Sequence, residues 1–166
     1  MPMTGKATLA ISATVIFLFA AWVGISVITF TKTAEDDLAA LPLEEGIVSY
    51  VIDGDTIILS DDDTRVRLIG IDAPELGEPL YAESRAFLEK LVGGRVVFIQ
   101  RDQTDTDPYN RLLRYIYVGT TLVNEEMVRG GLARGAIIPP DTRYAARILS
   151  AESSAKREHL GIWAEQ

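Results

Sequence analysis

Cysteine is absent from this chain of 166 residues, so neither a disulfide nor a thiolate metal site can form. Positive charge is also scarce, because 16 lysines and arginines stand against 24 acidic residues and leave a net charge of -8. This balance argues against a protein that holds duplex nucleic acid through a broad basic face without regard to sequence. The chain contains no internal repeat and no low-complexity tract. We therefore expect one domain with an N-terminal appendage.

Residues 7–30 carry no charged side chain, and this apolar segment is longer than the ~20 residues that cross a bilayer core as a helix. We predict an uncleaved membrane anchor. A cleaved signal peptide is the alternative, because Lys6 resembles its basic start, although its apolar region normally has only ~7–15 residues. The positive charge before the segment favours an inside N-terminus. The prediction is a single-pass membrane protein with an extracytoplasmic domain, or a secreted protein if the segment is cleaved.

The remaining chain divides into an acidic linker at residues 31–45 and a globular domain at residues 46–166. Apolar, β-branched runs at 47–52 and 56–59 flank Asp53-Gly54-Asp55, which is a strong turn signal. Further strands are expected at 64–71, 95–100 and 111–118, with helices after Pro79, at 122–129 and after residues 139–141. This order predicts an α+β, mainly β, fold. We expect a five-stranded OB-like barrel with about three flanking helices, preceded by one transmembrane helix.

Carboxylates and one arginine gather at the ends of the first and third expected strands. Asp53 and Asp55 follow the first strand, and Asp72 and Glu75 follow the third. Arg67 lies inside the third strand among apolar residues, where an unpaired charge would be costly. Carboxylate oxygens suit a hard cation such as Ca²⁺, and a guanidinium binds phosphate through a bidentate fork. The pattern therefore indicates phosphodiester hydrolysis.

A second arginine, Arg111, begins the fifth expected strand and lies beside Tyr109. Two guanidinium groups can offset the negative charge that develops on a phosphoryl group during hydrolysis. His159, the only histidine, is expected on the surface of the last helix, and Trp163 is expected to pack that helix onto the domain.

These blocks together resemble the staphylococcal (micrococcal) nuclease, or thermonuclease, family. The matching segments are residues 51–56, 67–75, 106–111, 115–117, 122–125, 128–129, 131–133 and 161–163. The resemblance implies that Asp55, Asp72 and the backbone carbonyl of Ala73 bind Ca²⁺. It also implies that Arg67, Glu75 and Arg111 are catalytic, and that Tyr109 joins the two arginines in binding substrate. Glu75 would act as general base or would order the attacking water, and these roles stay open.

Three positions depart from the family pattern. Pro108 stands where a basic residue is usual, and Ile137 and Pro139 stand where the best-known members have tyrosines. An aromatic ring stacked on a base contributes roughly 1–3 kcal/mol, so substrate affinity or base preference is expected to differ here.

The sequence as a whole predicts a membrane-anchored, Ca²⁺-dependent nuclease that acts on DNA or RNA, preferably single-stranded, and leaves 3′-phosphates. Its partners would be nucleic acid and the membrane, and a monomer is favoured. The alternative is a non-catalytic OB-fold module that binds nucleic acid or protein at the membrane. The presence of Asp55, Arg67, Asp72, Glu75 and Arg111 together speaks against that alternative.

Overall fold

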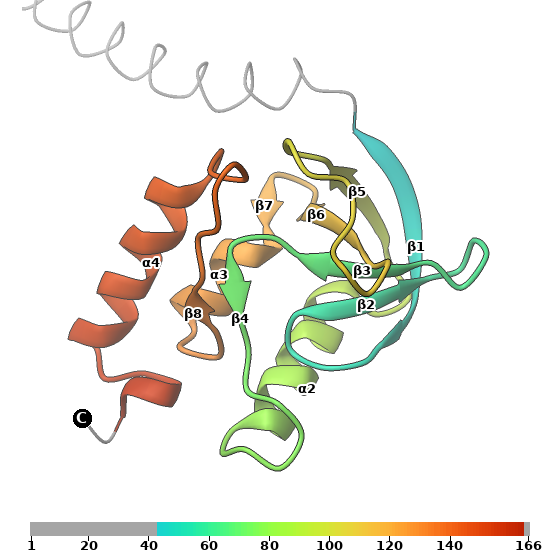
Figure 1. Cartoon of the computed structure of the whole chain (residues 1–166). Helices are drawn as coiled ribbons and strands as arrows, with labels where there is room; N and C mark the ends of the chain where they lie inside the picture. Colours follow the sequence, from blue (N-terminus) through green and yellow to red (C-terminus); the bar gives the residue numbers. More distant parts are fainter. Residues whose placement is uncertain (1–42, 165–166) are drawn as a thin grey trace, which may run out of the picture. The chain divides into compact units, whose positions relative to one another are not determined.

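Five strands close into a barrel in the structure, which is a computed structural model that describes residues 43–164 (Figure 1). They are β1 (Glu44–Val51), β2 (Thr56–Leu59), β3 (Arg65–Leu68), β5 (Val96–Gln100) and β6 (Leu112–Val118). Antiparallel pairing joins the strands in the order β3-β2-β1-β5-β6. A parallel pairing of β3 with β6 closes the barrel and sets Arg67 opposite Leu113. The expected five-stranded barrel is therefore confirmed.

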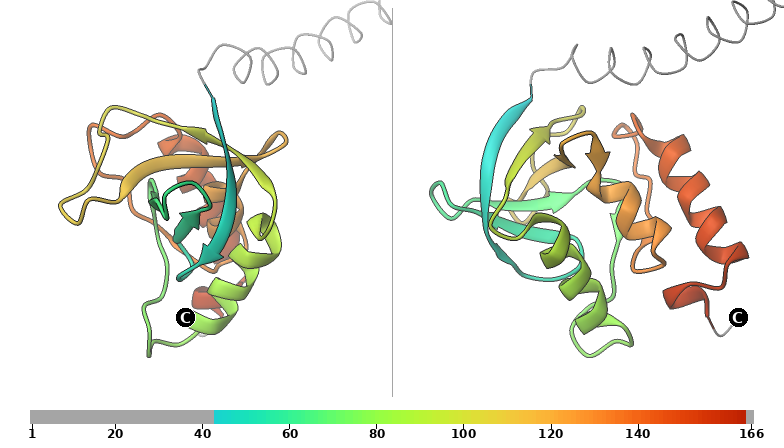
Figure 2. Two further views of the ribbon diagram at one scale, coloured as in Figure 1. Left: turned by 90° about the vertical axis from the view of Figure 1, so that its right-hand side faces the viewer. Right: turned by 180° about the vertical axis from the view of Figure 1, so that it is seen from behind.

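Three helices pack beside the barrel, as the sequence predicts. They are α2 (Tyr81–Val92), α3 (Val123–Arg129) and α4 (Ala145–Arg157), and a 3₁₀ turn, η1 (Gly161–Trp163), follows α4. α3 contacts β6 on one side and α4 on the other, and α2 contacts β1 and α3 (Figure 2). The buried face of α4 consists of Ile148, Ala151 and Ala155, whose spacing places them on one side of a helix.

The third expected strand divides in two, which is a difference from the sequence prediction. β3 ends at Leu68, Gly70 adopts a positive φ of 79°, and β4 (Ile71–Asp72) then leaves the barrel. Glycine reaches this left-handed conformation without the steric penalty of a Cβ atom. β4 pairs with β8 (Arg134–Gly135), a short strand that the sequence pattern does not indicate. Asp72 therefore lies outside the barrel wall, directly across from Arg134.

The barrel begins slightly before the expected domain start. Glu44 and Glu45, expected in the linker, are the first residues of β1 and pair with Ile99 and Phe98 of β5. A further short strand, β7 (Thr121–Leu122), extends β6 before α3. Within residues 43–164 no helix has the length and apolar character to cross a bilayer. The predicted span at residues 7–30 lies outside the described residues.

Asn124 connects the helical side to the barrel through buried hydrogen bonds. Its Oδ1 accepts the Ile116 N–H at 2.9 Å, and its amide donates to the Ile69 carbonyl at 2.9 Å. Asn124 is fully buried, so water cannot replace it as a partner for these two backbone groups.

We predict that Asn124→Leu lowers the free energy of unfolding by at least about 2 kcal/mol, because it leaves two buried backbone groups without a partner. Urea denaturation followed by circular dichroism would measure the change. Ser153→Ala, on the exposed side of α4, is the matched control and should change the value by less than about 0.5 kcal/mol. Equal stability of the Asn124→Leu and Ser153→Ala variants would contradict this assignment.

Candidate active site

The turn between β1 and β2 directs Asp55 into the protein. The Asp53 side chain accepts the Asp55 N–H at 3.0 Å, which caps the turn. Gly54 packs so closely on its neighbours that a Cβ atom there would lie 1.9 Å from Ser84 Oγ and 2.6 Å from Ala73 Cβ. Only glycine permits this approach. Asp53 thus has a turn-capping role, and Asp55 is the buried carboxylate of the pair.

The Asp55 carboxylate is held by three partners. Its Oδ2 accepts the Ala73 N–H at 2.8 Å and lies 2.6 Å from Arg67 Nη1, and its Oδ1 accepts the Thr56 hydroxyl at 3.0 Å. Burial nevertheless raises the pKa of the Asp55 carboxyl to about 7, and nearby Asp53 adds to the shift, although Arg67 and the Ala73 N–H lower it. Arg67 and the hydrogen bonds therefore do not bring the pKa of the buried carboxyl back to its value in water.

Arg67 joins the two carboxylates that the sequence predicts as metal ligands. Its Nη1 pairs with Asp55, and its Nη2 donates to Asp72 Oδ1 at 3.1 Å. Asp72 is largely exposed, whereas Arg67 Nη1 is buried and has no aligned hydrogen-bond partner within the described residues. The guanidinium therefore lies between one buried and one exposed acid and lines the cleft described below, where a guanidinium suits a phosphate.

Arg111 is oriented by Asp107, a residue that the sequence analysis did not select. Arg111 Nε lies 2.6 Å from Asp107 Oδ2, and Asp107 Oδ1 accepts the backbone N–H groups of Tyr109 and Arg111 at 2.9 Å. Burial raises the pKa of the Asp107 carboxyl, but these hydrogen bonds outweigh it, so the pKa lies below its usual range. The sequence does contain a signal for this contact, because Asp107 stands four residues before Arg111 in a polar loop where aspartate side chains commonly cap turns.

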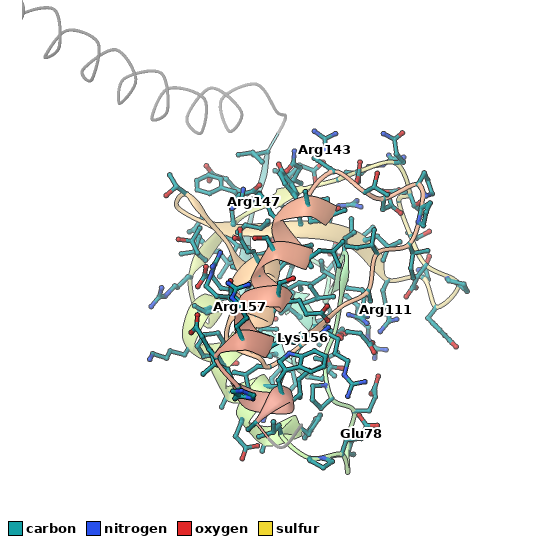
Figure 3. All side chains as sticks on the ribbon, turned by 90° about the vertical axis from the view of Figure 1, so that its left-hand side faces the viewer. Glu78, Arg111, Arg143, Arg147, Lys156 and Arg157 are labelled. Atoms are coloured by element: carbon teal, nitrogen blue, oxygen red, sulfur yellow. The ribbon has the colours of Figure 1, made fainter. Side chains whose placement is uncertain are left out.

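A cleft of about 410 Å³ brings these predicted residues together. Arg67, Asp72, Tyr109 and Arg111 line it, and Tyr109 is 81% exposed with its ring 5.6 Å from Arg111 Cζ. In the view of Figure 3, Arg111 projects to the right of α4. The rest of the cleft is mainly apolar and includes Leu113, Ile138 and Pro139.

Several residues that the sequence analysis discussed are absent from the lining of this cleft, among them Asp55, Ala73, Glu75 and Ile137. Ile137 Cδ1 instead lies beside Gly70, within 3.3 Å of where a Cβ on that glycine would be, so Ile138 takes the position at the cleft. Glu75 is exposed, and its N–H donates to Glu78 Oε2 at 2.8 Å. Its role as base or water-ordering group therefore stays a prediction.

The predicted cation site has a sparse set of ligands. Within residues 43–164 no three His, Cys, Asp or Glu side chains converge on one point. Asp55 and Asp72 nevertheless share one cationic group, the Arg67 guanidinium, and both offer carboxylate oxygens. Because Ca²⁺ also accepts backbone carbonyls and waters as ligands, this donor set with Ala73 suits the ion chemically.

Comparison with known proteins agrees with this combination of barrel and site. Residues 65–165 match the family described as staphylococcal nuclease homologue. The chain is 37% identical over 128 residues to a thermonuclease of Staphylococcus intermedius, covering 72% of this chain and 76% of the relative. A thermonuclease of Staphylococcus hyicus is 33% identical over 124 residues, covering 70% and 73% of the two chains. Endonuclease YncB of Bacillus subtilis is 36% identical over 124 residues, covering 69% and 59%.

The OB-like barrel, the two arginines at one cleft and these relatives together define a phosphodiesterase. The chain belongs to the staphylococcal nuclease family and is a hydrolytic nuclease, which confirms the predicted family and enzyme class.

Proposed function

We propose that this nuclease is a Ca²⁺-dependent endonuclease that hydrolyses DNA or RNA, with a preference for single strands, and leaves 3′-phosphate ends. The observation that carries the proposal is the pairing of Asp55 and Asp72 with one guanidinium at the mouth of the cleft that also holds Arg111. The two acids suit a bound cation, and the two arginines suit the negatively charged phosphate of the substrate.

The two arginines would bind and orient the scissile phosphate. Arg67 is held by Asp55 and Asp72, and Arg111 is held in place by Asp107. A fixed guanidinium needs little reorganisation when charge develops on the phosphoryl oxygens, so it favours the transition state over the ground state. Ca²⁺, when bound by Asp55, Asp72 and the Ala73 carbonyl, supplies further positive charge to the phosphate.

Hydrolysis would proceed by addition of water to phosphorus. The water oxygen forms the new bond to phosphorus, the bond from phosphorus to the 5′ oxygen breaks, and the leaving oxygen takes a proton to become a 5′-hydroxyl. Glu75 would accept a proton from the water or hold the water in line for attack. The phosphate stays on the 3′ oxygen of the other fragment.

The form of the cleft supports a single-stranded substrate. Its volume of about 410 Å³ and its apolar wall suit one unstacked base, and Tyr109 offers an exposed ring at its edge. The net charge of -8 does not favour binding along a duplex. Unpaired strands present their bases without the energetic cost of opening a helix.

We further propose that residues 7–30 anchor the enzyme in a membrane with the nuclease domain on the extracytoplasmic side. The support is the uncharged, apolar sequence of this segment and the lysine before it. If the segment is instead cleaved as a signal peptide, the same domain is secreted.

We predict that cleavage of denatured DNA requires Ca²⁺, ceases in chelator, and needs less Ca²⁺ as the pH rises. Below pH about 7 the metal-free protein keeps Asp55 protonated, so a cation must displace that proton. The Ca²⁺ concentration for half-maximal rate should fall about tenfold per pH unit from about pH 5 to 7 and then level off. Unchanged cleavage in chelator would refute the metal requirement, and a pH-independent Ca²⁺ requirement would refute the role of Asp55.

We predict that Arg67→Lys and Arg111→Lys each reduce kcat/KM by about 10²-fold or more, because lysine keeps the charge but loses the bidentate fork. Steady-state cleavage of a short single-stranded oligonucleotide would measure this. Arg65→Lys is the matched control, since Arg65 is an exposed residue of the same strand as Arg67. Wild-type rates in both variants would assign the two arginines a structural role only.

We predict that the full-length chain stays with membranes after a carbonate wash and that a fragment beginning at residue 43, which retains all of β1, is soluble. Immunoblotting of the washed membranes and of the supernatant would test both statements. Recovery of a shortened chain in the medium, with a new N-terminus determined by sequencing, would instead establish cleavage and secretion.

A further inference from the structure

A second cavity adjoins the proposed site on the other side of Asp72. It has a volume of about 350 Å³, and Asp72 lines both this cavity and the cleft that contains Arg67 and Arg111. Its walls combine apolar side chains with two carboxylates, Asp72 and Glu78, and one cation, Arg134. The principal lining residues are Pro74, Glu78, Pro79, Leu80, Arg134 and Ile162. In the view of Figure 3, Glu78 and Arg111 both lie to the right of α4.

Arg134 stands next to the proposed site because of the pairing between β4 and β8. It lies directly across from Asp72 in this antiparallel pair. Residues opposite each other in such a pair project from the same face, with Cβ atoms ~4.5–5.5 Å apart. Asp72 is therefore flanked by two arginines: it pairs with Arg67 at 3.1 Å, and Arg134 stands on the side of the second cavity.

Arg134 is an exposed cation without an acidic partner within residues 43–164, where no carboxylate oxygen lies within 4.0 Å of it. Several other arginines of the domain are paired with acids, including Arg114, Arg129 and Arg147. What orients Arg134 is an aromatic ring, since its Cζ lies 5.5 Å from the ring centre of Trp163. Trp163 is buried at the end of η1 and is a fixed support for the guanidinium.

We infer that the second cavity is a nucleotide subsite and that Arg134 binds a phosphate next to the scissile one. This inference rests on the proposed function, in which the scissile phosphate lies at Arg67 and Arg111, beside Asp72. A nucleic acid strand that crosses Asp72 would place one nucleoside in the cleft and the next nucleoside in the second cavity. Pro74, Pro79 and Leu80 offer an apolar surface to its sugar and base, and Arg134 meets the flanking phosphate.

The charged residues of the second cavity also determine at which end of it the flanking phosphate lies. Glu78 lies on its wall, and its Oε2 is engaged by the Glu75 N–H at 2.8 Å, so this carboxylate is held in place. A phosphate is repelled by Glu78 and attracted by Arg134, which places the flanking phosphate at the Arg134 side. Contacts on both sides of the scissile bond are those of an enzyme that cleaves within a strand.

The first experiment compares the salt dependence of KM for wild type, Arg134→Gln and Arg157→Gln on a single-stranded heptanucleotide at saturating Ca²⁺. Arg157 is an exposed arginine of α4 whose guanidinium donates to Ser154, so its replacement removes the same charge away from the cavities. Loss of one phosphate contact should reduce the slope of log KM against log salt concentration by about 0.7 in Arg134→Gln only. kcat should stay near the wild-type value, since the contact is made equally in the ground and transition states.

Arg134→Lys separates charge from packing on Trp163. If Arg134 binds a flanking phosphate, the lysine variant restores the wild-type slope, and thermal unfolding of all variants shows whether the fold is retained. An unchanged slope in a folded Arg134→Gln variant would overturn the inference and assign Arg134 to the support of Trp163. If Arg134→Gln does not fold, the inference instead depends on the second experiment, which includes Arg134→Lys.

The second experiment varies the substrate rather than the protein. Oligonucleotides with a single cleavable phosphodiester carry neutral methylphosphonates at the other linkages, and one flanking phosphate is restored on either side. In wild type, Arg157→Gln and Arg134→Lys, restoring the phosphate on one particular side should lower KM several-fold, and in Arg134→Gln it should have no effect. The same decrease in Arg134→Gln, or no decrease in wild type, would overturn the inference. If the wild-type protein cleaves neither these oligonucleotides nor natural DNA, the proposed function itself is refuted.

Discussion

The parallel pairing of β3 with β6 is the contact on which the site depends, because it joins two segments far apart in the chain. Its register sets Arg67 opposite Leu113, two residues beyond Arg111. Neighbouring strands lie ~4.8 Å apart, so this pairing brings the backbone positions of the two arginines close to one cleft. The two arginines converge without a contact between them, and each is instead oriented by an acid of its own. The closed barrel thus holds the two arginines near each other although their like charges repel.

Burial of Asp55 imposes the second constraint on this site. A carboxylate with little exposure prefers to be neutral, and the structure opposes this with Arg67, the Ala73 N–H and the Thr56 hydroxyl. These partners do not restore the ordinary pKa of the acid, so the site favours additional positive charge. Gly54 contributes to the same arrangement, because its missing side chain lets the turn approach Ala73 closely enough for that hydrogen bond. Local packing therefore determines how strongly the site attracts a cation.

Three arginines of this acidic protein line the two cavities beside Asp72. Arg67 and Arg111 line one cavity, and Arg134 lines the cavity on the other side of Asp72. The cleft is otherwise mainly apolar, which suits a base, whereas the second cavity sets apolar side chains beside Arg134 and two carboxylates. Ile138 and Pro139 line the cleft, and Pro139 together with Ile137 stands where the best-known members of the family have tyrosines. In the proposed function, substrate binding accordingly depends on a few directed contacts with the strand, because an acidic protein exerts little long-range attraction on nucleic acid.

The sequence by itself determined the barrel strands, the three helices and the identity of the acids and arginines, because alternating apolar residues, turn signals and charges inside strands are local properties. It did not show that Gly70 would break the third strand, that β4 would pair with residues 134–135, or that Asp107 would hold Arg111. It also did not show that Ile138 rather than Ile137 would line the cleft. Those features depend on which distant segments become neighbours when the barrel closes, and no local pattern records that choice. Chain composition and spacing thus specify the chemical groups, whereas tertiary packing decides which of them meet at Asp72.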